Sequence, residues 1–170
     1  MCLTGLMQKI LARYDGQLHN AALTKMVYLI DIESVKKTGN QITSISWVRD
    51  NYGPFVWDVL NSASENQALF AIGNEGNGKR LICSQIDIEI ERCEVDELLA
   101  ELVEKIPNPK TNFLSFVDYV YDTPPMFIST SNGPLDIQEA MESAKEVDEL
   151  VEELLSDPEW DEAFAYLAAH

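Results

Sequence analysis

The spacing of hydrophobic residues predicts a chain that is mainly helical. Four segments repeat apolar residues every three or four positions, which is the spacing of one face of an α-helix. These segments are residues 3–13, 23–38, 95–106 and 112–121. For the second helix we expect one apolar face and an end at Gly39, since glycine readily takes the left-handed conformation that closes many helices. Pro107 ends the third helix and Thr123-Pro124-Pro125 ends the fourth.

Alternating residues predict a small amount of β-structure between these helices. Residues 42–49 are rich in β-branched side chains, and even-numbered and odd-numbered positions form two alternating sets, as on the two faces of a short strand. Residues 68–72 and 80–83 flank a turn rich in Gly and Asn, which favours a β-hairpin. We expect the strand at 42–49 to pair with this hairpin, and residues 86–90 to form a further strand or extended edge.

A break at Tyr52-Gly53-Pro54-Phe55 follows the first predicted strand. The helical spacing restarts there and continues to Leu60. Pro54 is well suited to the first position of a helix, where its missing N–H is harmless. We therefore expect a helix to begin at Pro54.

The last part of the chain carries the most regular pattern. Apolar residues from Ile137 to Leu155 keep a heptad-like spacing, and Glu and Asp occupy nearly all other positions, which predicts an acidic amphipathic helix. Asp157-Pro158 then resembles the start of another helix.

Together these patterns indicate an α+β fold that is predominantly α-helical. We expect a helical bundle with a small antiparallel sheet or hairpin, followed by an acidic helical extension at the C-terminus. The simplest division is a domain over residues 1–132 and acidic amphipathic helices over residues 133–170, packed on the same domain.

The charge of the chain is concentrated in its second half. The net charge is -17, with eight basic and seven acidic residues in residues 1–85 but four basic and twenty-two acidic residues in residues 86–170. Such a surface repels nucleic acid, because affinity for nucleic acid depends largely on Lys and Arg at the phosphates. We therefore expect no direct nucleic-acid binding. From composition alone the charge favours a merely solvated surface, and if this surface binds a partner, we expect a basic protein rather than nucleic acid.

Candidate chemistry is sparse. Cys2, Cys83 and Cys93 form no C-x-x-C pair, His19 lies in a predicted turn, and His170 is terminal. We find no phosphate loop, calcium loop or nucleophile–histidine pattern, and accordingly predict no catalytic residue, no cofactor, no metal site and no enzymatic activity. No stretch approaches the roughly 18 apolar residues of a membrane span, so we expect a cytoplasmic protein without a membrane partner.

Two stretches resemble the signature of the Panacea (SocA-like) antitoxin domain family. The first is Leu23-Thr24-Lys25-Met26-Val27-Tyr28-Leu29-Ile30-Asp31, similar to the family's helix with Lys, Tyr and an acidic or small polar residue. The second runs from Gly39 through Trp47 to Tyr52-Gly53-Pro54-Phe55. Weaker similarity extends over residues 3–130, including Tyr121–Met126.

This resemblance implies an antitoxin that binds and neutralises a protein toxin. The motif residues are Lys25, Tyr28, Asp31, Tyr52, Gly53, Pro54 and Phe55. We expect Tyr28, Gly53 and Pro54 to serve the fold, because such residues fix buried rings and turns. Trp47, Arg49 and Trp57 are the candidate partner-binding residues, since aromatics and Arg are enriched at interface hot spots.

Two other functions stay open from the sequence. One is an adaptor or regulatory module, of bacterial or phage origin, that delivers or modulates a bound protein. The other is a metal-dependent hydrolase, because acidic residues are abundant enough for carboxylate chemistry, although no acidic motif supports it.

Overall fold

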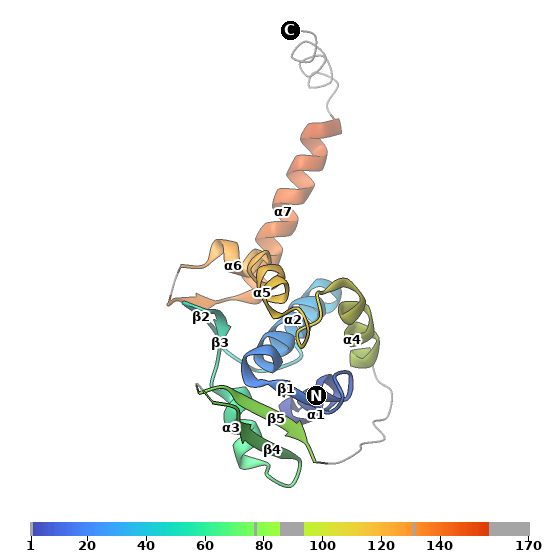
Figure 1. Cartoon of the computed structure of the whole chain (residues 1–170). Coiled ribbons are helices and arrows are strands. Elements are labelled where there is room, and N and C mark those ends of the chain that lie inside the picture. Colours follow the sequence, from blue (N-terminus) through green and yellow to red (C-terminus); the bar gives the residue numbers. More distant parts are fainter. Residues whose placement is uncertain (1, 77, 86–93, 131, 157–170) are drawn as a thin grey trace.

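The computed structural model describes residues 2–76, 78–85, 94–130 and 132–156, which form seven helices and six strands (Figure 1). The helices are α1 (Leu3–Ala12), α2 (Asn20–Thr38), α3 (Asp58–Glu65), α4 (Glu94–Lys105), α5 (Phe113–Tyr121), α6 (Pro124–Ile128) and α7 (Ile137–Ser156). The strands are β1 (Gln17–His19), β2 (Trp47–Asp50), β3 (Gly53–Phe55), β4 (Phe70–Asn74), β5 (Arg80–Ser84) and β6 (Pro134–Leu135). The fold is α+β and predominantly helical, as predicted.

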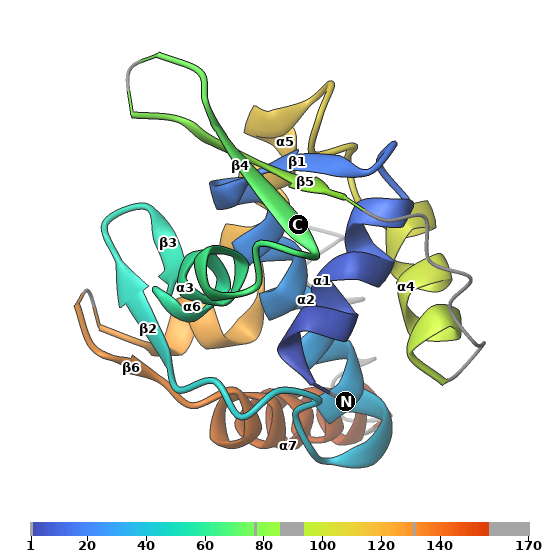
Figure 2. The same cartoon turned by 90° about the horizontal axis from the view of Figure 1, so that it is seen from below.

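Helix α2 is the centre of the molecule, and α1, α3, α4, α5 and α7 all pack against it (Figure 2). Residues such as Leu29 and Ile32, outside the predicted apolar face, are as buried as Leu23 and Met26 within it. The prediction of one apolar face was therefore too narrow, because a helix enclosed by others buries nearly its whole circumference. Its predicted end is confirmed, since Gly39 closes it with a φ of 75°.

Two separate three-stranded antiparallel sheets flank the helices. One has the strand order β1-β5-β4 and the other β3-β2-β6. The hairpin of β4 and β5 is confirmed, but its third strand is β1 rather than the segment near Ile42. That pairing was missed because β1 has only three residues and follows a predicted helix closely.

The predicted strand at 42–49 begins later than its alternation suggested, at Trp47. The backbone N–H groups of Ile42 and Thr43 donate to the carboxylate of Asp31, at 3.0 and 2.9 Å. Because a side chain on α2 takes these donors, residues 42–46 form a loop against that helix instead of a strand.

Pro54 lies in β3 and not at the start of a helix, which begins only at Asp58. Gly53 has a φ of 97° and reverses the chain, so that Pro54 pairs with Arg49 and Phe55 with Val48. The prediction was wrong because Gly53 makes a hairpin turn, and proline is tolerated at a sheet edge.

The other predicted helices are confirmed at α1, α4, α5 and α7. The prolines that end α5 also begin the short helix α6. α7 leaves the body of the molecule after its first turns (Figure 1). The strand predicted at 86–90 and the helix predicted after Asp157 lie outside the described residues.

Candidate functional site

Asp31 is the hub that attaches the loop before β2 to the central helix. Its carboxylate is 0% exposed and accepts five hydrogen bonds. The donors are Ile42 N, Thr43 N, Thr43 Oγ1, Gln41 Nε2 and Trp47 Nε1, the last at 2.9 Å. A buried carboxylate is tolerated when donors surround it in this way.

Tyr28 lies one helical turn from Asp31 and also contacts Trp47. Their rings meet edge to face with centroids 5.3 Å apart, and the Tyr28 hydroxyl lies 3.0 Å from Thr123 Oγ1. Burial raises the pKa of Tyr28 above its ordinary value, so the hydroxyl stays protonated. Tyr28 therefore links α2, β2 and the start of α6 through one buried ring.

Lys25 reaches from α2 to the turn between β2 and β3. Its ammonium, on a side chain only 6% exposed, donates to Tyr52 O at 2.9 Å. Desolvation lowers the pKa of Lys25 to about 8, although the charge of Asp50 acts in the opposite direction. Tyr121 Oη also donates to Asn51 O at 3.1 Å, so two side chains fix the backbone of this turn.

Arg49 fastens the same sheet to α6. Its Nη1 donates to Met126 O at 2.7 Å and also to Ser129 O, which are carbonyls at or near the helix. The Arg49 backbone N–H donates to Gly133 O at 2.9 Å. These bonds occupy the guanidinium within the chain, and they hold β2 between α6 and β6.

A cluster of apolar side chains, which we call the hairpin surface, lies at this sheet: Val48, Tyr52 and Trp57 are exposed, and Phe55 is half-buried. Tyr52 is 82% exposed and Trp57 is 62% exposed. Phe55 and Trp57 pack edge to face with centroids 5.1 Å apart. The surface therefore presents three aromatic rings beside a rigidly held turn.

The structure brings the motif residues together, and they differ in how deeply they are buried. Lys25, Tyr28 and Asp31 are buried on successive turns of α2, whereas Tyr52 is exposed and Phe55 is half-buried. Trp47 is 2% exposed and lies in the core, so we leave it out of the proposed contact surface. Of the three candidate partner-binding residues, only Trp57 presents a largely exposed side chain.

Thr43, Thr123 and Tyr121 complete this arrangement. Tyr121 and Thr123 lie in the Tyr121–Met126 stretch that resembles the family, but none of the three was predicted as a site residue. Each acts through a single hydroxyl that meets a partner distant in sequence. Thr123 stands before a Pro-Pro pair, which marked it as a helix end but carried no signal of its bond to Tyr28.

Groups suited to catalysis or metal binding do not gather at this site. Among the described residues, no three His, Cys, Asp or Glu side chains lie close enough to hold a metal ion. His19 ends β1, rather than lying in a turn, and its Nε2 is 3.3 Å from Glu75 Oε2. No helix in the described ranges has the length and apolar character needed to cross a membrane.

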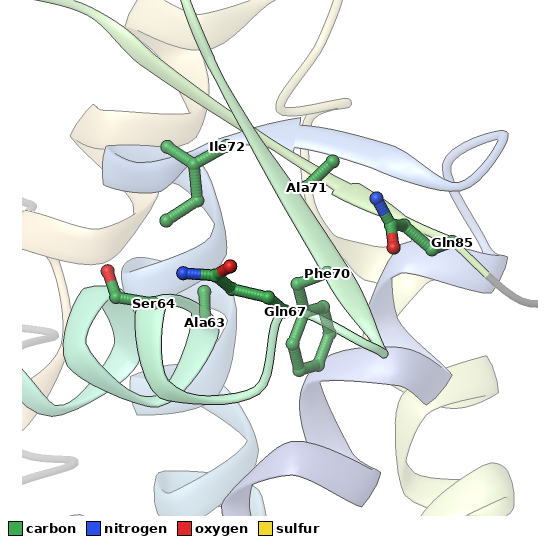
Figure 3. A pocket seen from close by; sticks show the side chains of 7 residues that line it. All are labelled: Ala63, Ser64, Gln67, Phe70, Ala71, Ile72 and Gln85. Atoms are coloured by element: carbon green, nitrogen blue, oxygen red, sulfur yellow. The ribbon is translucent and has the colours of Figure 1, made fainter.

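A hollow of about 350 Å³ lies elsewhere, between α3 and β4. Figure 3 shows the α3 side chains of Ala63 and Ser64 opposite Phe70 and Ile72 on β4, with Gln67 between the two elements. All seven lining residues are neutral, the others being Ala71 and Gln85. The hollow therefore offers amide and hydroxyl groups but no acid–base pair.

Comparison with known proteins gives one match. No curated protein and no solved structure matches the chain. The family model described as antitoxin SocA-like, Panacea domain, matches residues 23–124, which is more than half of the chain and includes most of α2, the strands β2 and β3, and α5. The protein therefore belongs to the SocA-like Panacea antitoxin domain family.

Proposed function

We propose that the protein is an antitoxin that neutralises a protein toxin by binding it directly, without catalysis, and that the hairpin surface makes the contact. Family membership supports the antitoxin role. The observation that carries the assignment of the surface is the exposure of Tyr52 and Trp57, at 82% and 62%, on a segment of the family domain. Large exposed aromatics of this kind are typical of interaction surfaces.

The rigidity of the turn supports a binding role. Lys25 and Tyr121 hold the carbonyls of Tyr52 and Asn51, while Arg49 ties the strand to α6. A surface that is already ordered loses less conformational entropy when a partner binds. The buried Lys25 of the motif thus helps to hold the turn that carries the exposed Tyr52 in one conformation.

We also propose a basic toxin and a cytoplasmic place of action. The net charge of -17 would accelerate encounter with a positively charged protein. Cys2 and Cys83 are free thiols, which fits a reducing compartment.

Co-expression with the product of the neighbouring gene tests this function. We expect a stoichiometric complex and restored growth when both proteins are present. Trp57→Ala combined with Tyr52→Ala should weaken binding by roughly a hundredfold, because truncated aromatic hot spots commonly cost 2 kcal/mol or more. The matched control is Leu114→Ala, which truncates a side chain that is 78% exposed on α5.

Two outcomes would contradict the proposal. The absence of any complex and of growth rescue would remove the antitoxin function. Unchanged binding by the double variant would place the contact on another surface. A toxin that disappears from cells in the presence of the antitoxin would favour delivery for degradation over simple sequestration.

A further inference from the structure

The outer part of α7 has an apolar face that the described residues leave uncovered. At the base of the helix, Ile137 and Ala140 are buried at 0% and 4% exposure. Farther along, Val147, Leu150 and Val151 are 58%, 56% and 45% exposed. We call these three residues the α7 stripe.

The α7 stripe continues the buried face of the same helix. Positions 137, 140, 144, 147 and 151 follow the three- and four-residue steps that place side chains in one line. The line thus begins in the core and ends in solvent. A face with the pattern of a core, extended beyond the body that would cover it, is suited to a partner.

A groove at the base of α7 lies between this helix and the end of α2, on the side of α7 away from the stripe. It encloses about 530 Å³ and is lined by Val35, Lys36 and Gly39 at the end of α2 and by Gln138, Met141, Glu142 and Lys145 on α7. Met141 also packs against the core. The groove faces away from the stripe and carries Lys36 and Lys145, so it is not part of the apolar face at the end of the helix.

Charge decides which partner fits this face. α7 contains seven acidic residues and one lysine, Lys145. The helical period puts Asp148 on one flank of the stripe and Glu146 and Glu153 on the other. A second copy of α7 would bring like charges together, which is destabilising, whereas a basic segment would meet opposite charge on both flanks.

We propose that the α7 stripe docks a basic amphipathic helix of the toxin. Apolar residues of that helix would cover Val147, Leu150 and Val151, and its Lys or Arg residues would lie against the acidic flanks. This inference rests on the proposed function for the identity of the partner. It differs from that function in the surface and in the chemistry of the recognised segment.

A pair of synthetic peptides tests the docking face without the toxin. Both are helical and share one leucine stripe, but one carries lysine and the other glutamate on its flanks. We expect the full-length protein to bind the lysine peptide and not the glutamate peptide. Val147→Gln with Val151→Gln should weaken this binding by roughly tenfold or more, because glutamine keeps the helix but not the apolar face. Leu114→Gln is the matched control.

Charge variants distinguish an effect of the acidic residues that flank the stripe from an effect of the net negative charge of α7. Glu146→Gln with Asp148→Asn should weaken binding of the lysine peptide more than Glu149→Gln with Glu152→Gln, which removes equal charge from the far side of α7. Equal binding of the lysine peptide by the stripe variant and the unmodified chain would overturn the proposal. The proposal would also be overturned if the full chain forms dimers and the stripe variant is monomeric, because a second copy of the chain would then occupy the stripe.

The product of the neighbouring gene distinguishes this inference from the proposed function. If that protein binds the stripe variant as tightly as the unmodified chain, the antitoxin function stands and the α7 docking face falls. If it does not bind the chain at all, while the lysine peptide still requires the stripe, the antitoxin function falls and α7 remains a docking face for basic helices.

Discussion

The central helix α2 and the terminal helix α7 have 19 and 20 residues but occupy opposite environments. Five other helices pack around α2, which buries even Lys25 and Asp31. In contrast, α7 buries its base and exposes Val147 and Leu150. In α2 the sequence encodes the scaffold, whereas in the outer part of α7 a similar apolar content is left available at the surface.

The two helices also use charge differently. In α2, each buried charge has a specific partner: the turn carbonyl for Lys25 and five donors for Asp31. In α7, acidic residues surround an apolar line, and the ion pair Lys145–Glu149, at 3.5 Å, is exposed. Mutations should therefore affect mainly folding in α2 and mainly association in the outer part of α7.

The largest expected effect follows from Asp31→Ala. The change leaves the donors of Thr43 and Trp47 buried without their acceptor, so we expect a loss of about 3–5 kcal/mol in the free energy of unfolding. Chemical denaturation measures this loss. The control Asp118→Ala, at an exposed position of α5, should change stability by less than about 0.5 kcal/mol. Equal effects would refute the role of Asp31 as a hub.

Within α7, stability should depend on distance from the body. Ile137→Ala removes a fully buried side chain and should cost about 2–4 kcal/mol. Val147→Ala, on the same line of the helix but 58% exposed, should cost less than about 0.5 kcal/mol. A large loss from Val147→Ala in thermal unfolding would mean that the outer stripe is covered in solution.

A smaller effect is expected from Tyr28→Phe. The ring still packs on Trp47, but the hydroxyl near Thr123 is lost, which should cost about 1 kcal/mol. Tyr52→Phe provides the control, because that side chain is 82% exposed. If urea unfolding gave both variants the same stability as the unmodified chain, the buried bond would contribute nothing.

Lys25 should make stability depend weakly on pH. Its pKa falls from 10.5 to about 8 in the folded state, so the unfolded chain binds more protons between these values and stability rises with pH. We expect this rise from pH 8 to about 9.5, below the ordinary pKa of tyrosine. Lys25→Met should flatten the profile in denaturation measured across this range. A profile that stays as steep would assign the dependence to other groups.

Much of the helical structure could be predicted from the sequence because it depends on local spacing. The end of α2 at Gly39 and the whole of α7 follow from nearby residues. The short strands β1, β3 and β6 could not be predicted, since two or three residues carry no periodic signal and pair with distant segments.

The sequence indicates a set of candidate site residues but not how they are arranged in space. The motif placed Lys25, Tyr28 and Asp31 on one helix, yet only the structure shows which distant groups they hold. Trp47 illustrates the limit: its type suits an interface as well as a core, and its bond to Asp31 assigns it to the core. Trp57, of the same type, lies at the surface.

The pairing of β6 with β2 has a consequence for anyone who wishes to transplant the acidic helix. Leu135 and Pro134 pair with Trp47 and Val48, and Gly133 accepts from Arg49. The segment that precedes α7 is therefore hydrogen-bonded to the sheet through β6. A chimera that moves α7 to another Panacea domain has to carry residues 133–141 with it, and a truncation at 132 would remove the edge strand β6 that pairs with β2.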